Sequence, residues 1–384
     1  MTKSRPAPAN GGIINVYKPA GMASFHVVHL LKRWLGESKI GFDGTLDPFA
    51  EGVLPIYIGR ATAVLHYAEA KEKSYLSYLG LGWSTDSLDA SGTEVIARCE
   101  RSSVDRLSRS EIESALECIC RRREQRVPVY SAAKHEGQRF VDLLRRGEAD
   151  KIPERYKTIQ VEAFELLADD LDENYSESYP SWPISQALLT AFPTSEYDAG
   201  PYAHLLCEGL SRALLIRHVV SRGTYIRQLN SDLAEILSVP ASTLRLLRER
   251  SGPFHAREAV HLSALEEWSQ SRGRFLLENE QYDEILQAPD LVLKNFAMIT
   301  CRSREVRMLL QGKKLKPGQV AKALSDSSSE TALEDFLDAS RHEIGPNYLR
   351  LYCGDRLIGL LRHEADLIRA ERMFVGIESF NAEF

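Results

Sequence analysis

The sequence has few of the patterns that mark secreted, metal-binding or membrane proteins. Its 384 residues include six cysteines but no CxxC pair, which argues against a zinc site and against a disulfide framework. No stretch approaches the run of about 18 apolar residues that a transmembrane helix needs. The N-terminus, MTKSRPAPANGG, has positive charges without an apolar segment behind them. We therefore expect no secretory signal and a cytoplasmic protein.

A large excess of charge of one sign is also missing, since the net charge is -6. Hydrophobic residues make up 43% and charged residues 27%, which excludes collagen-like and disordered chains, and the length predicts two to three domains. The charges are unevenly distributed, however. Residues 161–200 contain nine acidic residues and no Lys or Arg, whereas residues 121–147 contain eight Lys or Arg and three acidic residues. A mildly acidic protein can therefore still present a basic face to a nucleic acid.

Hydrophobic periodicity and turn residues predict a chain in which strands and helices are mixed. We expect Ser24 and Thr224 to begin helices, Ser24 as an N-cap. The expected elements, in chain order, are a strand beginning GIINVY, a helix from Ser24 to Gly36, the strand VLPIYIG, a strand at 71–82, a helix at 110–124, a strand at 214–220, a helix from Thr224, and short strands within 291–384 that a polar stretch at 325–331 interrupts.

Two features suggest reactive groups before any comparison is made. The loop GFDGTLDPFAEG places Asp43 and Asp47 between a helix and a strand, where a rigid scaffold can hold an exposed side chain, although an ordinary Asp-Pro turn is the alternative. If a helix begins at Thr224, Arg227 lies in its first turn, where the helix dipole disfavours a positive charge by about 0.3 to 1 kcal/mol. Such an arginine should have an anionic partner, unless it is simply exposed to water.

The loop GFDGTLDPFAEGVLPIYIGRAT resembles the catalytic loop of the TruB family of tRNA pseudouridine synthases. Further segments follow in the order of the family, and together they cover roughly residues 12–265: YKPAGMAS, KSYLSYLGLGWSTDSLDASG, PVYSAAKHEGQRF, SRGTYIRQL and LLRERSGPF. The resemblance implies an α+β pseudouridine synthase fold, with a central mixed, largely antiparallel sheet flanked by helices. It also implies a small C-terminal PUA-like, β-rich RNA-binding domain.

These expectations divide the chain into segments. The expected segments are a flexible N-terminus at 1–12, a catalytic domain at 13–285 with a basic RNA-gripping insertion at 121–150 and an acidic loop or insertion at 170–203, and the PUA-like domain at 291–384.

The resemblance also assigns roles to individual residues. Asp47, in TLDP, matches the nucleophilic aspartate of the family, and Arg227, in GTYIR, matches the cation beside it. A carboxylate nucleophile must be ionised, and a neighbouring cation favours that form. Tyr75 matches the tyrosine that stacks on the target base, and Tyr225 matches a second tyrosine of the pocket. Base-on-aromatic stacking contributes about 1 to 3 kcal/mol.

Three further residues are expected to contact the substrate. Leu246 aligns with a leucine of the family, with a neighbouring register available in LRLL, and Lys18 lies in the YKPAG segment. Phe42 replaces the usual histidine and can still stack in the RNA loop, but it cannot hydrogen-bond or carry charge. Asp43 adds a negative charge near Asp47, which by itself would oppose ionisation of Asp47 and repel phosphate.

The expected substrate is uridine 55 in the T loop of tRNA, read as a folded stem-loop. The isomerisation needs no cofactor, and we expect no metal, no membrane partner, no guide RNA and a monomer. The main alternative is a tRNA-binding or tRNA-folding chaperone that does not depend on catalysis. A second alternative is the related archaeal and eukaryotic synthase that works with guide RNA.

Overall fold

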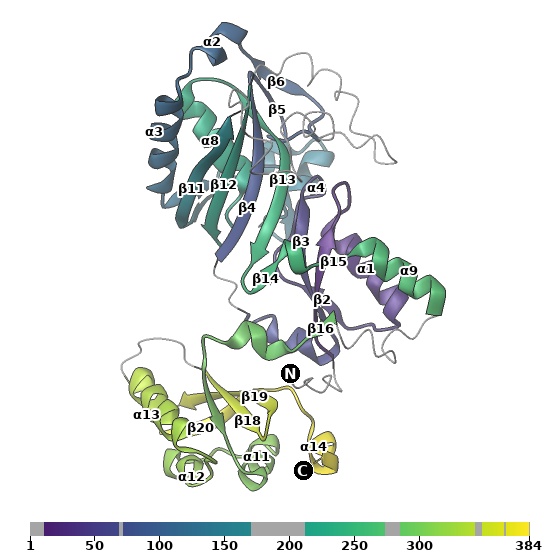
Figure 1. Cartoon of the computed structure of the whole chain (residues 1–384), viewed down its shortest axis with the longest axis vertical. Helices are drawn as coiled ribbons and strands as arrows, with labels where there is room; N and C mark the ends of the chain where they lie inside the picture. The colour runs from purple at the N-terminus through teal and green to yellow at the C-terminus, as the bar shows by residue number, and fades with distance from the viewer. Residues whose placement is uncertain are drawn as a thin grey trace.

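The structure is a computed structural model that describes residues 11–68, 72–169, 212–272, 285–341, 348–364 and 366–383. It consists of a large body built on one extended sheet and a smaller C-terminal body below it (Figure 1). The predicted acidic loop at 170–203 lies outside the described residues. Among the helices that the structure describes, none combines the length and the hydrophobicity needed to span a membrane.

The large body is organised around a ten-stranded sheet with the order β11-β12-β4-β13-β3-β1-β15, to which β14, β16 and β2 are joined at β13, β1 and β3. The β13–β3 and β1–β15 pairs are parallel and the other pairs antiparallel, so the predicted mixed, largely antiparallel sheet is confirmed. Its strands are β1 (Ile13–Lys18), β2 (Ile40–Phe42), β3 (Glu51–Ile58), β4 (Glu72–Leu81), β11 (Val161–Asp169), β12 (Arg212–Ser221), β13 (Ala241–Ser251), β14 (Phe254–His255), β15 (Val260–His261) and β16 (Leu286–Gln287).

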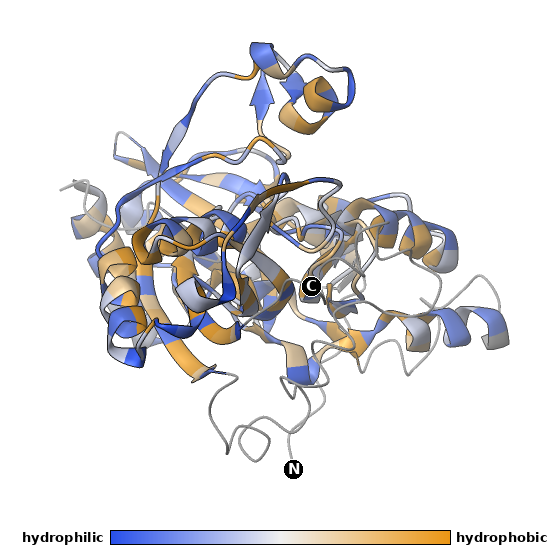
Figure 2. Cartoon of the chain, turned by 90° about the horizontal axis from the view of Figure 1, so that it is seen from above, coloured by the Kyte–Doolittle hydropathy of each residue, from blue (hydrophilic) through white to orange (hydrophobic). Residues whose placement is uncertain are grey.

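Alternation along β4 explains how both faces of the sheet are filled. Tyr75 and Leu79 face a core beneath helices α3 (Arg109–Cys120) and α8 (Ile226–Leu237), whereas Leu76 and Tyr78 face a second cluster around Trp83. Both helices carry apolar and polar residues along their length, as Figure 2 shows for the helices in general. This is the pattern of helices that bury one face on a sheet.

A third core lies at the other end of the sheet, under α1 (Ser24–Leu35) and α9 (Leu262–Arg272). The predicted helix from Ser24 to Gly36 is present, but Ala23 is the N-cap residue and makes no side-chain cap. The Ser24 hydroxyl instead bonds to the backbone of Leu46, 22 residues away. Likewise, Thr224 precedes α8, whose N-cap residue is Tyr225.

Several short elements link the main strands and form the basic insertion. These are η1 (Gly59–Val64), β5 (Trp83–Thr85), β6 (Val95–Arg98), α2 (Arg101–Asp105), β7 (Glu124–Arg126), β8 (Lys134–His135), β9 (Gln138–Arg139), α4 (Phe140–Arg145), η2 (Ala149–Lys151), β10 (Tyr156–Thr158), η3 (Ala256–Glu258) and η5 (Pro289–Leu293).

The C-terminal body is a four-stranded sheet covered by helices that the sequence analysis did not predict. The polar stretch expected to interrupt the strands contains the start of one of these helices, at Ser327. Its elements are β17 (Ala297–Thr300), α11 (Ser303–Leu310), α12 (Pro317–Ala321), α13 (Ser327–Arg341), β18 (Leu349–Cys353), β19 (Arg356–Glu364), β20 (Leu367–Met373) and α14 (Ile377–Glu383).

The two bodies share an apolar cluster that includes Tyr67 and Val64 from the large body and Leu360 and Phe374 from the C-terminal body. The Tyr67 hydroxyl donates to Glu371 across this contact at 3.4 Å. The C-terminal sheet is therefore packed onto the large body.

Candidate active site

The loop that precedes β3 is fixed by contacts from two other segments, one containing Gly21 and Ser24 and the other containing Arg248. Ser24 Oγ accepts from Leu46 N and donates to Leu46 O, both at 2.9 Å. The carbonyl of Pro48 accepts from Gly21 N at 2.8 Å, and Arg248 Nη2 donates to Gly44 O at 3.0 Å. Because backbone atoms on both sides of Asp47 are held in this way, the loop presents its carboxylate from a rigid support.

Asp47 and Arg227 are 180 residues apart in the sequence and form an ion pair. Arg227 Nε donates to Asp47 Oδ2 at 2.8 Å. The Arg227 side chain is only 4% exposed, whereas that of Asp47 is 35% exposed. Among the described residues, none donates a hydrogen bond to Asp47 Oδ1. The carboxylate is thus bound on one side and open to a substrate on the other.

Further contacts hold the Arg227 guanidinium, which lies in the first turn of α8 as the sequence predicts. Nη1 donates to Ser87 O at 2.7 Å and Nη2 donates to Tyr130 O at 2.9 Å. Asp89, also buried, lies 3.4 Å from Nε. Although burial lowers the pKa of Arg227, the attraction of Asp47 and Asp89 outweighs it, and the net direction is upward.

Asp89 is a buried carboxylate that the sequence analysis quoted within a motif but gave no role. Its Oδ1 accepts from Ser87 Oγ and Ser91 N, both at 2.9 Å. Burial raises the pKa of Asp89, with Arg227 opposing and Asp47 reinforcing that rise. Two carboxylates, buried Asp89 and partly exposed Asp47, therefore lie close to the same guanidinium nitrogen.

The predicted aromatic and aliphatic residues are buried or half-buried in the structure. Tyr75 and Leu246 lie on the same face of the sheet, in the cluster that also contains Leu46. Leu244 belongs to the cluster on the opposite face, so Leu246 and not Leu244 shares a face with Tyr75. Tyr225 is half-buried. Its pKa is raised first by burial, with Asp47 reinforcing the shift, while a hydrogen bond with Ser131 and the charge of Arg227 oppose it.

Lys18 is a correction to the sequence analysis, which expected it to bind substrate. The residue is fully buried, and its Nζ donates to Pro19 O at 2.8 Å, Met22 O at 2.7 Å and Pro48 O at 3.2 Å. Burial lowers the pKa of Lys18 to about 7. Backbone carbonyls accept all three of these hydrogen bonds, and the one from Pro48 belongs to the loop. Lys18 therefore supports the loop.

Phe42 and Asp43 stand at the other end of the loop. Phe42 ends β2 and packs partly against the cluster under α1, and it remains partly exposed. Asp43 is buried and lies 3.6 Å from Lys73 and 3.5 Å from Arg222. The charge of Asp43 therefore does not act alone, because two cations compensate it.

Cations that the sequence analysis did not select lie around the turn before α8. Lys157, on β10, reaches over Gly223, where a Cβ would collide with its ammonium group. Gly223 has a φ of 81°, which also favours glycine at this position. The charge of Arg155 is close enough to Tyr225 to lower its pKa, against the rise caused by burial. Arg222 is largely exposed. These three residues form what we call the cationic rim.

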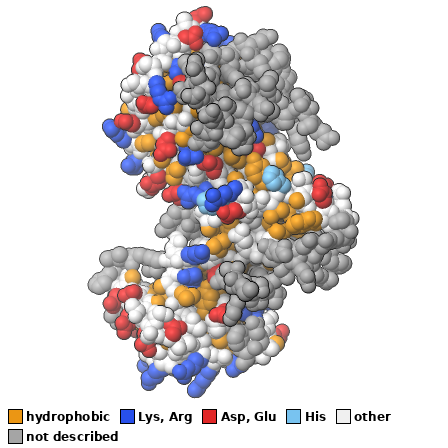
Figure 3. Space-filling model, viewed as in Figure 1, with side chains coloured by type: hydrophobic (Ala, Val, Ile, Leu, Met, Phe, Trp, Pro, Cys, Tyr) orange, Lys and Arg blue, Asp and Glu red, His pale blue; other side chains and the backbone are white. Residues whose placement is uncertain are grey.

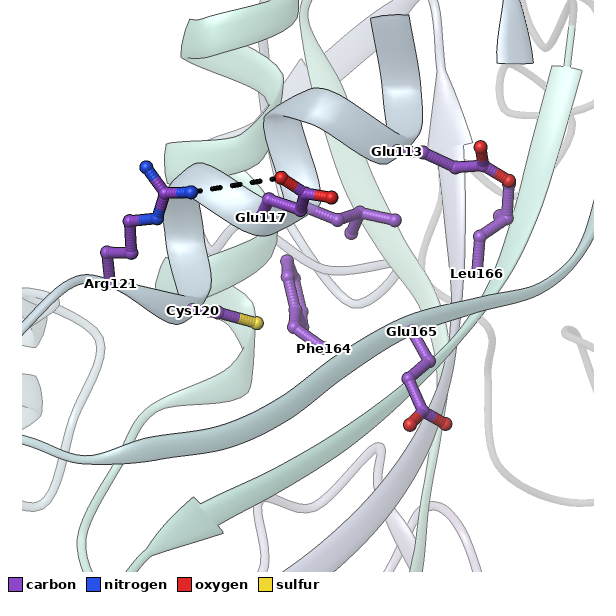
Figure 4. A pocket seen from close by; sticks show the side chains of 8 residues that line it. Glu113, Glu117, Cys120, Arg121, Phe164, Glu165 and Leu166 are labelled. Carbon is purple, nitrogen blue, oxygen red and sulfur yellow. Dashed lines mark ion pairs between the residues drawn. The ribbon is translucent and has the colours of Figure 1, made fainter. Parts of the chain in front are cut away.

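A separate cavity of about 450 Å³ lies between α3 and β11, away from this site (Figure 4). Three carboxylates line it, and Arg121, whose Nη2 is 3.9 Å from Glu117, is the cation among its lining residues. An acidic cavity of this kind repels phosphate. The loop carrying Asp47 is therefore the better candidate for RNA chemistry.

Comparison with known proteins supports this choice. A family model described as TruB family pseudouridylate synthase (N terminal domain) matches residues 32–177. The tRNA pseudouridine synthase B of Bacillus cytotoxicus is 30% identical over 332 residues, which are 86% of this chain and 90% of that relative. The chain belongs to the TruB family. It is accordingly an isomerase with tRNA pseudouridine synthase activity.

A further TruB relative agrees with this assignment, and solved structures share the fold. The tRNA pseudouridine synthase B of Clostridioides difficile is 27% identical over 94% of this chain and 99% of the relative. The crystal structure of a Cbf5-Nop10-Gar1 complex contains a similar chain, with a TM-score of 0.59 at 19% identity, covering 99% of this chain and 94% of that one. This likeness confirms the fold expected from the resemblance.

Proposed function

We propose that this TruB-family protein converts uridine 55 in the T loop of tRNA to pseudouridine, with Asp47 as the nucleophile. Relatives of similar length are named tRNA pseudouridine synthase B. The observation that carries the proposal is the 2.8 Å contact between Arg227 Nε and Asp47 Oδ2, in a carboxylate whose side chain remains 35% exposed. The buried guanidinium holds a partly exposed carboxylate in place, and nucleophilic catalysis requires a carboxylate that a substrate can reach.

The reaction conserves every atom of the nucleoside. The bond between ribose C1′ and uracil N1 breaks, the base turns, and C1′ joins C5. The proton leaves C5 and N1 gains one, so no electrons enter or leave. Asp47 bonds to C1′ as the bond from C1′ to N1 breaks, and it is released again when C5 of the turned base attacks C1′. The Arg227 charge stabilises the released carboxylate.

The target base must leave its stack to reach Asp47, which costs a few kcal/mol. Tyr75 belongs to the buried cluster that also contains Leu46 and Leu246. Tyr225 lies beside Arg227 at the start of α8. We assign Tyr75 to stacking on the base, Tyr225 and Leu246 to the pocket wall, and partly exposed Phe42 to the RNA loop.

The phosphate backbone would be held by the basic insertion and by the cationic rim of Arg155, Lys157 and Arg222. These contacts fix the position of the RNA without reading its sequence, and they weaken as salt rises. Figure 3 shows Lys and Arg side chains at the narrow middle of the molecule and again at the lower end of the C-terminal body. We infer that the C-terminal body contributes a second RNA-binding surface.

Product mapping on tRNA tests the proposal. Unmodified tRNA transcript is incubated with the purified protein, and pseudouridine is located by chemical labelling. Product at position 55 without guide RNA or cofactor is the expected result, and a transcript with cytidine at that position should give none. Product only when a guide RNA is added, or tight tRNA binding without product, would replace the proposal with one of the two alternatives.

A further inference from the structure

Gln125 makes a two-point contact with the backbone of Tyr225. Its Nε2 donates to Tyr225 O at 2.9 Å, and its Oε1 accepts from Tyr225 N at 2.8 Å. The residue is 1% exposed and lies on β7, at the beginning of the basic insertion. One side-chain amide thus satisfies both backbone polar groups of the residue that precedes α8.

The first turn of α8 has no cap from its own N-cap side chain. Tyr225 O also accepts the first helical hydrogen bond, from Leu229 N at 3.1 Å. Arg227 follows Tyr225 by two residues, within the first turn. Any shift of the Tyr225 backbone therefore moves the guanidinium that contacts Asp47.

The segment that begins at Gln125 touches the site at further points. Tyr130 O accepts from Arg227 Nη2 at 2.9 Å, and Ser131 hydrogen-bonds with the Tyr225 side chain. Tyr130 Oη donates to Asp86 at 2.6 Å, on the turn that also carries Ser87. Residues 125–131 therefore enclose Tyr225 and Arg227 from the side on which the insertion lies.

We propose that Gln125 is a positioning residue, which holds Tyr225 and the first turn of α8 so that Arg227 meets Asp47 in the geometry the isomerisation requires. This inference rests on the proposed function. Small displacements of catalytic groups cost rate far more than they cost affinity. Because Gln125 belongs to the basic insertion, the position of the insertion then affects how Arg227 meets Asp47 and so affects the rate of isomerisation.

Replacement by methionine tests the role, because Gln125→Met keeps the length of the side chain and removes both hydrogen bonds. Asn15→Leu is the matched control, since Asn15 is also buried and its Nδ2 donates to the backbone carbonyl of His255 at 2.8 Å. With enzyme in excess over tRNA, we expect the rate of Gln125→Met to fall about 10- to 100-fold. The tRNA dissociation constant should change by less than about threefold, because phosphate contacts set affinity.

Asn15→Leu should lower the melting temperature without this loss of rate. Equal rates for Gln125→Met and the wild-type protein, or a loss of affinity as large as the loss of rate, would overturn the inference. A wild-type protein that forms no pseudouridine would instead overturn the proposed function, so the two failures can be told apart.

Gln125→Glu gives a second measurement, the pH dependence of the rate, which would not change if Gln125 only stabilised the fold. A protonated carboxyl group can donate to Tyr225 O and accept from Tyr225 N as the amide does, whereas the ionised form cannot donate. The rate relative to the wild-type protein should therefore rise as the pH is lowered, and a constant ratio would contradict the role. The charged groups around this position are the same in both proteins: Asp47, Arg227, Arg155, Glu124 and Arg126.

Discussion

The two ends of the loop before β3 each carry an aspartate, and their surroundings differ. At one end, the side chain of Asp43 is 2% exposed and lies between Lys73 and Arg222 at 3.6 Å and 3.5 Å. At the other end, the side chain of Asp47 is 35% exposed and contacts Arg227 at 2.8 Å. Both carboxylates have cationic neighbours, but only Asp47 is open to solvent.

This difference separates a structural carboxylate from a candidate nucleophile. A nucleophile must be ionised and must also reach its target atom. Asp43 does not meet the second condition, because the protein surrounds it. Asp47 does, because Arg227 approaches it from the buried side and its side chain stays partly exposed. Residue type and loop position alone would not distinguish the two.

The largest expected effect compares Asp47→Asn with Asp43→Asn. The first removes the nucleophile, and the rate of pseudouridine formation should fall by about 10⁴-fold or more while tRNA binding stays nearly intact. The second leaves the nucleophile in place, and its rate should stay within about tenfold of wild type despite a loss of stability. Single-turnover assays and filter binding measure both quantities. Appreciable turnover by Asp47→Asn would refute the nucleophile assignment.

Arg227→Lys tests the cation at the Asp47 end. Lysine keeps the charge, but its single ammonium group cannot bond to Asp47, Ser87 O and Tyr130 O together. We expect the single-turnover rate to fall about 10²- to 10³-fold. Arg212→Lys is the control, because Arg212 is also buried and its Nε bonds to Asp169 at 2.8 Å outside the site. Similar losses in both variants would show that stability, not positioning, is responsible.

The unfolding free energy of the protein should depend on pH through Lys73, which lies beside Asp43. Burial lowers the pKa of Lys73 from 10.5 to about 8, with Arg248 adding to the effect and Asp43 opposing it. Between pH 8 and pH 10.5 the unfolded chain binds a proton at Lys73 that the native protein does not bind. The contribution of Lys73 to the unfolding free energy therefore increases as pH rises through this range, and it is lost as pH falls to about 8.

Lys73→Met should remove that contribution. Urea unfolding of both proteins from about pH 8 to pH 10.5 should give a difference in unfolding free energy that grows by up to about 1.4 kcal/mol per pH unit. Arg227 stays charged throughout, because the pKa of its guanidinium is raised. Parallel pH profiles would mean that Lys73 is protonated in the native state across this range.

The residues that the sequence placed correctly are those whose constraint is local. The position of Arg227 in a first helical turn followed from helical periodicity, and its need for an anionic partner followed from the helix dipole. The strands β4 and β12 also followed from local sequence patterns, whereas β13 was not predicted. The family resemblance then identified Asp47 as the partner of Arg227, and the structure places the two in contact.

The residues that the sequence misplaced depend on contacts between distant segments. Lys18 was expected at the substrate but is buried, and it bonds to the carbonyl of Pro48 in the loop and to those of Pro19 and Met22 in its own segment. Ser24 was expected to cap a helix but bonds to Leu46. Gln125 gave no signal, since a glutamine in a basic stretch is typical of a solvated surface. No local pattern reports which distant backbone group a polar side chain will meet.

Ser24→Ala gives the smallest expected effect and tests the support beneath Asp47. It removes two hydrogen bonds to Leu46, and we expect the unfolding free energy to fall by about 1 to 3 kcal/mol. Ser251→Ala is the matched control near Asp43, because the buried Ser251 hydroxyl has no hydrogen-bond partner among the described residues. Its replacement should leave stability unchanged or raise it by up to about 1 kcal/mol. If both variants unfold at the same urea concentration, Ser24 does not anchor the loop, and the rigidity of the Asp47 end must come from Lys18 and Arg248.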